Sequence, residues 1–258
     1  MIKKMPVALL SLCVSLSGCA KDRSLAPPAD SESITVTVKV PKELVARPMQ
    51  VMYRSTLCTF TDHSAFGEAY QRDGYQRTDI QPVREGQSDL YVAKLPIDGG
   101  GVCQWRLSNV TFGVTYDDPA RFGENVTYGA GGGVVVIFDR NNSPRGGADI
   151  KVEGDLTIKK DYYPWMSETF IGGHRKDISL LGEGQDYYLS YQALQALDVY
   201  FEPILHSGFL VSSLGPKVKK KGSYAVFTYP DASIESVARA KPDFRRLQAI
   251  RLAAENKQ

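Results

Sequence analysis

Residues 34–40, Ile-Thr-Val-Thr-Val-Lys-Val, indicate the fold class of this chain. Apolar side chains stand at every second position, polar side chains stand between them, and most of the residues are β-branched. A period of two is typical of a strand that buries one face. Pro41 ends the pattern, because proline has no N–H to give to a sheet. We therefore expect a mainly β protein.

Similar stretches follow on the C-terminal side of this segment. We expect strands over residues 49–56, 90–95, 102–116, 134–138, 149–159 and 224–229, and a strand followed by a helical turn or a second strand over 187–201. The apolar run 134–138 predicts a strand buried on both faces. In 102–116 the parity of the apolar positions shifts between Leu107 and Val110, which predicts a bulge or a short turn near Ser108 and Asn109. Gly113 predicts a further bulge.

A helical pattern occurs only near the C-terminus. Apolar residues of 233–256 recur at helical spacing, Asp231 or Ser233 can cap the start, and Pro242 breaks or kinks the helix. The sequence thus predicts an antiparallel β-sandwich-like body with one C-terminal helix. We expect a long loop over residues 61–88, within which a short hairpin can form, and a loop over residues 117–133.

The N-terminus has the features of an export signal. Lys3 and Lys4 precede an apolar stretch, residues 6–16, which is too short to span a bilayer as a helix. Leu16-Ser17-Gly18-Cys19 resembles the lipobox of bacterial lipoproteins. The resemblance implies cleavage before Cys19 and attachment of diacylglycerol and a fatty acyl chain such as palmitate to Cys19. Ala20 and Lys21 differ from the Asp that retains lipoproteins in the inner membrane, which favours the outer membrane. An ordinary secreted protein or an N-terminal core helix is the alternative.

The expected organisation has four parts. Residues 1–18 form the signal peptide, and 19–33 form a lipidated flexible tether of small, polar and proline residues. Residues 34–160 form the β-sandwich-like domain. Residues 161–258 form either a mixed β domain or its continuation, ending in the helix.

Two cysteines remain after Cys13 is removed with the signal and Cys19 is lipidated. Cys58 and Cys103 predict a disulfide in an oxidising compartment, with free buried thiols or an incomplete metal site as alternatives. The three histidines are scattered without ligand-like spacing, so we expect no metal and no cofactor. Of the 31 basic residues, the signal removes two, which leaves 29 against 29 acidic residues. This neutral balance gives no indication of nucleic-acid binding.

Motifs of catalysis are missing from the sequence, which contains no GxSxG, HExxH or Walker loop, and we do not expect an enzyme. Residues 174–177, His-Arg-Lys-Asp, only partly match a phospholipase D signature and predict a solvated turn. The glycine run 129–133 precedes a strand, which favours a hairpin over a phosphate loop. A calcium site from Asp117, Asp118, Glu124 and Asn125 matches no known spacing.

Two further groups of side chains have a structural and a functional interpretation. Residues 217–221, Lys-Val-Lys-Lys-Lys, favour a solvated loop over a phosphate-binding patch. An aromatic set favours core packing, with a sugar- or protein-binding surface as the alternative; its members are Tyr162, Tyr163, Trp165, Tyr187, Tyr188 and Tyr191.

The lipobox, the cysteine pair and residues 99–105, Gly-Gly-Gly-Val-Cys-Gln-Trp, together resemble the lipoprotein immunity proteins that accompany phospholipase effectors of type VI secretion systems. The resemblance implies a periplasmic protein that binds and neutralises a secreted phospholipase through an exposed loop or sheet edge in 61–88 or 117–133. It assigns no individual partner-binding residue. A structural or assembly lipoprotein of the envelope and a glycan-binding lipoprotein are the alternatives.

Overall fold

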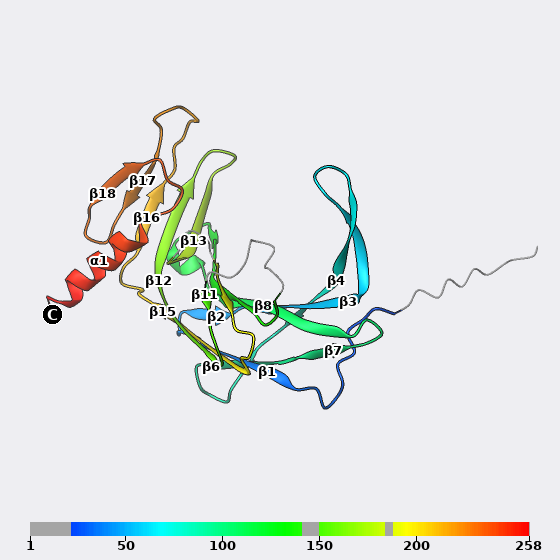
Figure 1. Ribbon diagram of the computed structural model, residues 1–258. Coiled ribbons are helices and arrows are strands. Elements are labelled where there is room, and N and C mark those ends of the chain that lie inside the picture. The colour runs from blue at the N-terminus through cyan, green and yellow to red at the C-terminus, as the bar shows by residue number, and fades with distance from the viewer. Residues whose placement is uncertain (1–21, 141–149, 184–187, 258) are drawn as a thin grey trace, which may run out of the picture.

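The computed structural model describes residues 22–140, 150–183 and 188–257, which form two sheets and one C-terminal helix (Figure 1). The predicted signal peptide and Cys19 lie outside these residues. Within them, no helix is long and apolar enough to cross a bilayer. The expectation of a mainly β, sandwich-like body with a single C-terminal helix is confirmed.

The first sheet contains ten strands among the described residues, in an order that differs from their order in the chain. They are β1 (Ser33–Lys39), β5 (Val83–Arg84), β6 (Leu90–Pro96), β9 (Val126–Tyr128), β12 (Leu156–Thr169), β13 (Arg175–Gly182), β15 (Asp198–Leu205), β16 (Val211–Leu214), β17 (Ala225–Thr228) and β18 (Ile234–Val237).

The second sheet contains eight strands of the described chain. They are β2 (Leu44–Ala46), β3 (Met49–His63), β4 (Ala69–Ile80), β7 (Asp98–Gly100), β8 (Trp105–Tyr116), β10 (Gly132–Ile137), β11 (Ile150–Lys151) and β14 (Tyr188–Gln192). A short 3-10 helix, η1 (Ala120–Phe122), and the helix α1 (Phe244–Glu255) complete the described elements.

The sheets are mixed, because parallel pairs join strands that are distant in the sequence. β15 lies between β1 and β12 and runs parallel to both. The carboxylate of Glu202 on β15 binds Lys39 of β1 at 2.9 Å and Lys159 of β12 at 3.1 Å. These contacts lower the pKa of Glu202, mainly through the hydrogen bond from Lys39. Residue 160, where the sequence suggested a domain boundary, lies inside β12, so both halves of the chain share this sheet.

The main core lies between the two sheets. Ile34, Val36 and Val38 of β1 are buried while the intervening residues are partly exposed, as the period of two predicts. Burying each such side chain contributes about 2 kcal/mol. Phe112 of β8 meets Phe201 of β15 edge-to-face, with ring centroids 5.9 Å apart, which joins the sheets at their centre. β10 is buried on both faces along most of its length, as its apolar run predicts.

Irregularities of β8 follow the sequence only in part. The pairing with β3 passes from Met52–Asn109 to Tyr53–Leu107, so Ser108 is the extra residue, and the predicted bulge is confirmed. The predicted bulge at Gly113 is wrong, because Gly113 pairs with Gly133 of β10 in continuous register. Glycine at position 113 instead lets β8 and β10 approach closely, since a Cβ there would lie 2.1 Å from the Gly132 carbonyl oxygen.

The predicted start of the C-terminal helix is wrong. Residues 234–237 form β18, which pairs with β17 through a turn in which Ala232 has a φ of 62°. Asp231 accepts a hydrogen bond from the Ser233 amide at 3.1 Å and therefore stabilises this turn instead of capping a helix. The helix begins after Pro242, where Asp243 accepts a hydrogen bond from the Arg246 amide at 3.2 Å as the N-cap.

A second, smaller core packs α1 against the end of the first sheet. It comprises Tyr163, Trp165, Leu181, Val211, Phe227, Tyr229 and Leu247. Leu247 is the buried residue of the helix. Pro164 lies within β12 between Tyr162, the last residue paired with β15, and Trp165, the first paired with β16. The missing N–H of Pro164 therefore falls where the neighbouring strand changes.

Candidate interaction surface

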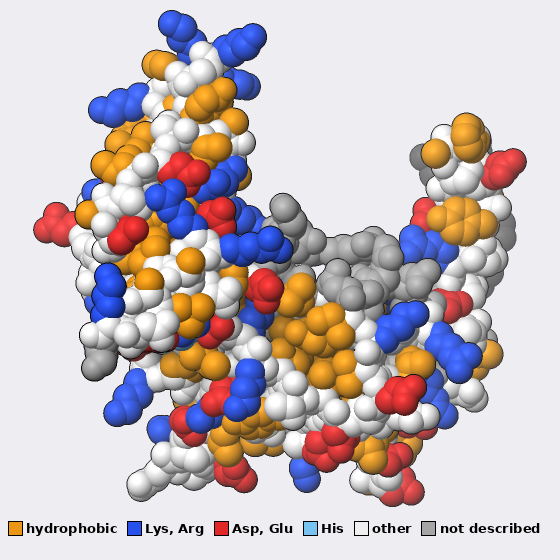
Figure 2. Space-filling view, turned by 60° about the vertical axis from the view of Figure 1, so that its left-hand side comes forward, with side chains coloured by type: hydrophobic (Ala, Val, Ile, Leu, Met, Phe, Trp, Pro, Cys, Tyr) orange, Lys and Arg blue, Asp and Glu red, His pale blue; other side chains and the backbone are white. Residues whose placement is uncertain are grey.

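The most prominent surface feature is the distal part of the β3–β4 hairpin, residues 56–73, which we call the arm. Figure 1 shows it leaving the body, and Figure 2 shows it opposite the end of the first sheet with a hollow between them. None of its residues is buried. The expectation of a long loop over 61–88 is wrong for residues 61–63 and 69–80, which belong to β3 and β4. The hairpin that the sequence allowed in this region is present, but it is longer than expected and begins before residue 61.

The base of the arm contains a large bulge. Ser55 pairs with Gly74 and Phe60 pairs with Arg72, so residues 56–59 stand opposite one residue of β4. The hydroxyl of Ser55 accepts hydrogen bonds from the amides of Leu57 and Cys58 at 3.1 and 3.0 Å. The hydroxyl also donates to the Cys103 carbonyl at 2.5 Å. The side chain of Ser55 thus replaces the ladder bonds that the bulge removes.

The predicted disulfide Cys58–Cys103 is confirmed and crosses this bulge, with 5.4 Å between the Cα atoms. It ties the arm to the turn that precedes β8. Gly74 lies against it from the other strand, and a Cβ there would be 1.8 Å from the Cys58 carbonyl oxygen. The residue at position 74 must therefore be glycine for the bulge to close in this form.

Side-chain contacts hold the two strands of the arm together beyond the base. Phe60 and Tyr75 pack edge-to-face at 5.6 Å, and the Arg72 guanidinium lies 5.6 Å from the Phe60 ring centre. Arg72 also binds Asp62 at 2.8 Å, and its hydrogen bond lowers the pKa of Asp62. Because an isolated two-stranded hairpin is only marginally stable in water, these contacts and the disulfide explain how the arm keeps its shape.

The tip of the arm presents one aromatic side chain to solvent. The hydroxyl of Ser64 accepts hydrogen bonds from the amides of Phe66 and Glu68, both at 3.2 Å, and Gly67 adopts a φ of 84°. The Phe66 side chain is 94% exposed. Aromatic side chains held at a fixed position are typical of protein-binding hot spots. The arm also ends its sheet, because β4 is the last strand and its outer edge is unpaired among the described strands.

The expected tether is ordered over most of its described part, residues 22–33. Trp105 Nε1 donates to the Arg23 carbonyl at 2.9 Å, and the Ala26 amide donates to the Gly99 carbonyl at 2.9 Å. Leu25 packs against the main core. The prediction of a flexible tether is therefore wrong for residues 23–26, because the glycines of β7 let this segment lie directly on the body.

Aromatic residues that the sequence offered as a possible binding surface form part of the core. Tyr162, Tyr163 and Trp165 are buried, and Tyr191 packs against the main core. A Cβ on Gly132 would lie 2.5 Å from the Tyr162 ring. The packing of this ring therefore explains why position 132 of the glycine run lacks a side chain. Tyr187 and the side chain of Tyr188 lie outside the described residues.

The other candidate motifs occupy ordinary structural positions. The glycine run leads into β10. The predicted hairpin is wrong, because β9 before the run pairs with β13 of the first sheet and β10 pairs with β8 and β14 of the second. Residues 217–221 form an exposed loop. His174 follows a turn and binds Glu168 at 2.7 Å, while Asp177 lies within β13. Asp118 accepts a hydrogen bond from the Ala120 amide at 2.8 Å at the start of η1. Residues 117–133 also contain β9, so they form less of a loop than expected. No group of three His, Cys, Asp or Glu in the described chain lies close enough to hold a metal ion.

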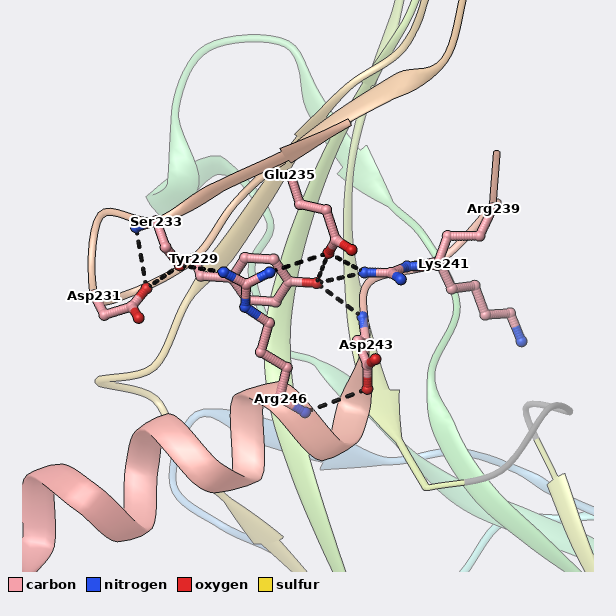
Figure 3. Close-up of polar contacts among 8 residues, drawn as sticks. All are labelled: Tyr229, Asp231, Ser233, Glu235, Arg239, Lys241, Asp243 and Arg246. Carbon is pink, nitrogen blue, oxygen red and sulfur yellow. Dashed lines mark hydrogen bonds and ion pairs between the residues drawn. The ribbon is translucent and has the colours of Figure 1, made fainter. Parts of the chain in front are cut away.

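A dense polar cluster joins α1 to the β17–β18 hairpin (Figure 3). The Tyr229 hydroxyl donates to Glu235 at 3.1 Å and accepts from the Asp243 amide at 3.1 Å and from Arg239 at 2.8 Å. Glu235 also pairs with Arg239 and with Arg246, which lies 4.3 Å from the Tyr229 ring centre. Burial raises the pKa of Tyr229. Because acidic and basic groups neutralise one another here, we interpret the cluster as a structural clamp.

Comparisons of the chain with family models, with curated proteins and with solved structures found no significant match. Any inference about function therefore depends on the geometry of the arm and on the sequence of the N-terminus. The sequence placed part of the arm among the possible contact regions and allowed a short hairpin there, but it did not predict the extent of the strands. Gly67 at the turn, with Phe60 between two threonines before it, is the signal from which the full hairpin could have been found.

Proposed function

We propose that this protein is a lipoprotein, anchored through Cys19 at the periplasmic side of the outer membrane, that binds and neutralises a secreted phospholipase effector of the type VI class. The arm carries the contact with the effector. The protein acts by binding, without a cofactor and without chemistry of its own.

The observation that carries the proposal is the preorganised arm. Its disulfide, the Ser55 hydrogen bonds and the tip turn fix the shape of a segment in which no residue is fully buried. Such rigidity reduces the conformational entropy lost on binding and thereby favours high affinity. Phe66 at the tip can enter a recess of a partner, and the edge of β4 can pair with a partner strand.

Tethering supports this role. A protein held at the membrane has a high effective concentration where a phospholipase must work. The resemblance of the lipobox, the disulfide and residues 99–105 to lipoprotein immunity proteins supplies the class of partner. A structural or assembly lipoprotein would use the same arm to bind a neighbouring scaffold. A glycan-binding lipoprotein has less support, because the described aromatic rings proposed for it are packed in the core.

The test is protection of living cells. The immunity role predicts that a secreted phospholipase is encoded beside this gene, and cells that export that phospholipase to the periplasm should survive with the wild-type protein and lyse with Phe66→Ser. Val218→Ser is the matched control, because Val218 is also exposed but lies in the loop between β16 and β17. Labelling with a palmitate analogue should mark the wild type and not Cys19→Ala. Equal survival without the protein would reject the immunity role, and a secretion defect in its place would favour the assembly role.

A further inference from the structure

The segment that begins the described chain is built into the body beside the base of the arm. Gly100 and Gly101 have φ values of 58° and 70°, and Cβ atoms there would lie 2.1 and 2.6 Å from the carbonyl oxygens of Ala26 and Ser24. Because these two glycines have no side chains, the backbone of residues 24–26 lies directly against them. On its other side, Trp105 approaches β4, with its ring edge 3.5 Å from a Cβ placed on Gly74.

Buried Tyr53 packs against the residues that precede these glycines. The Tyr53 hydroxyl donates to the Pro96 carbonyl at 2.9 Å, and burial raises its pKa to about 12, so it remains a donor at neutral pH. A Cβ on Gly99 would lie 2.7 Å from the Tyr53 ring. The exit point of the N-terminal segment is therefore fixed relative to the arm by close packing on both sides.

The distance from this exit point to the proposed anchor is short. Asp22 lies three positions after Cys19, and three extended residues span about 11 Å. A protein that carries its lipid on Cys19 must therefore hold this end of the body at the headgroups. This upper limit on the distance between Cys19 and the body follows from the number of residues between them alone.

Exposed aliphatic and basic side chains are found on residues directly next to those that fix the exit point, namely the disulfide cysteines and Trp105. Leu57 and Val102 each directly precede a cysteine of the disulfide, and they are 61% and 62% exposed. Arg23 is exposed at the start of the segment, and the Arg106 side chain is 67% exposed. Aliphatic side chains flanked by arginines are typical of surfaces that rest in the boundary between headgroups and acyl chains.

From this arrangement we propose that Arg23, Leu57 and Val102 form a membrane-contact face that rests on the phospholipid bilayer. The inference depends on the lipid anchor of the proposed function. With this face on the bilayer, the base of the arm is held at the lipid surface, and the partner is met where its substrate lies. The occupant of the face is lipid, and the arm remains available for protein.

The test uses the full lipidated protein in vesicles of phosphatidylethanolamine and phosphatidylglycerol, some of which carry bromine near the headgroup end of the acyl chain. Tryptophan is introduced as Val102→Trp and, as a matched control of 61% exposure, as Val218→Trp. We expect the added emission of Val102→Trp to fall to about half in brominated vesicles and that of Val218→Trp to stay unchanged. A Leu57→Trp variant should behave like Val102→Trp and guards against a local folding defect.

Flotation of the vesicles distinguishes failure of the lipid anchor from failure of the membrane-contact face. If the wild-type protein does not float with the vesicles, the lipid anchor and therefore the proposed function fail. If it floats, but neither Val102→Trp nor Leu57→Trp is quenched more than Val218→Trp, the membrane-contact face is wrong while the anchor stands. Quenching that appears only in a Phe66→Trp variant would place the tip of the arm in the bilayer and would also overturn the inference.

Discussion

Removal of the Cys58–Cys103 disulfide should destabilise the whole protein and release the arm in particular. The bond closes a loop with a sequence separation of 45. On the chain-entropy relation, a loop of this length corresponds to about 4 kcal/mol of the free energy of unfolding. For a slope of about 3 kcal/mol per M, the urea midpoint should fall by about 1.3 M.

The assay compares the unlipidated mature chain, made with Cys19→Ala, with the same chain carrying Cys58→Ser and Cys103→Ser. Hydrogen exchange measured in parallel should show the largest loss of amide protection in residues 56–63 and 69–73, because the arm has no buried side chain of its own. Protection of β1 in the main core should change only through the global stability. Equal urea midpoints for the two chains, or an arm that exchanges no faster without the bond, would refute the reasoning.

Three further perturbations test separate parts of the fold. Gly74→Ala should prevent the bulge from closing and leave Cys58 and Cys103 reactive to a thiol reagent, whereas Gly208→Ala, which meets no atom within 4 Å, should leave them oxidised. Trp105→Phe removes the bond to Arg23 and should speed tryptic cleavage at Arg23, whereas Trp165→Phe, which loses only a bond to Ser213, should not. Glu202→Gln should lower the free energy of unfolding by roughly 1 kcal/mol near neutral pH. Because the folded pKa of Glu202 is lowered from its ordinary 4.5, this difference should be complete above that pH and disappear as the pH falls through the folded value, which acid titration of both chains would measure.

Local patterns predicted those parts of the fold where one face of a strand is buried. The alternation in 34–40 gave β1, the parity shift after Leu107 gave the bulge at Ser108, and the cysteine count gave the disulfide. The length of the arm was missed because both of its faces are in solvent, so no buried apolar positions mark its strands. The start of the helix was misplaced because Ile234 and Val237 stand at helical spacing, whereas pairing with β17, which no local pattern indicates, makes residues 234–237 a strand.

Long-range contacts were beyond the reach of sequence periodicity. The parallel pairing of β15 with β1 and β12 joins residues far apart in the chain, and nothing local in 198–205 indicates its neighbours. The docking of residues 23–26 depends on Gly99, Gly100 and Trp105, which are distant in the sequence. The candidate site is therefore an outcome of tertiary packing, and only its cysteines and the part of the arm that lies in 61–88 could be anticipated.

The central claim predicts a secreted phospholipase encoded beside this gene, and calorimetric titration of that phospholipase into the oxidised protein tests the claim most directly. The account predicts one-to-one binding, with an affinity at least about 30-fold weaker for Phe66→Ser and unchanged for Val218→Ser. Equal affinities for wild type and Phe66→Ser, or no binding by the wild type, would contradict it.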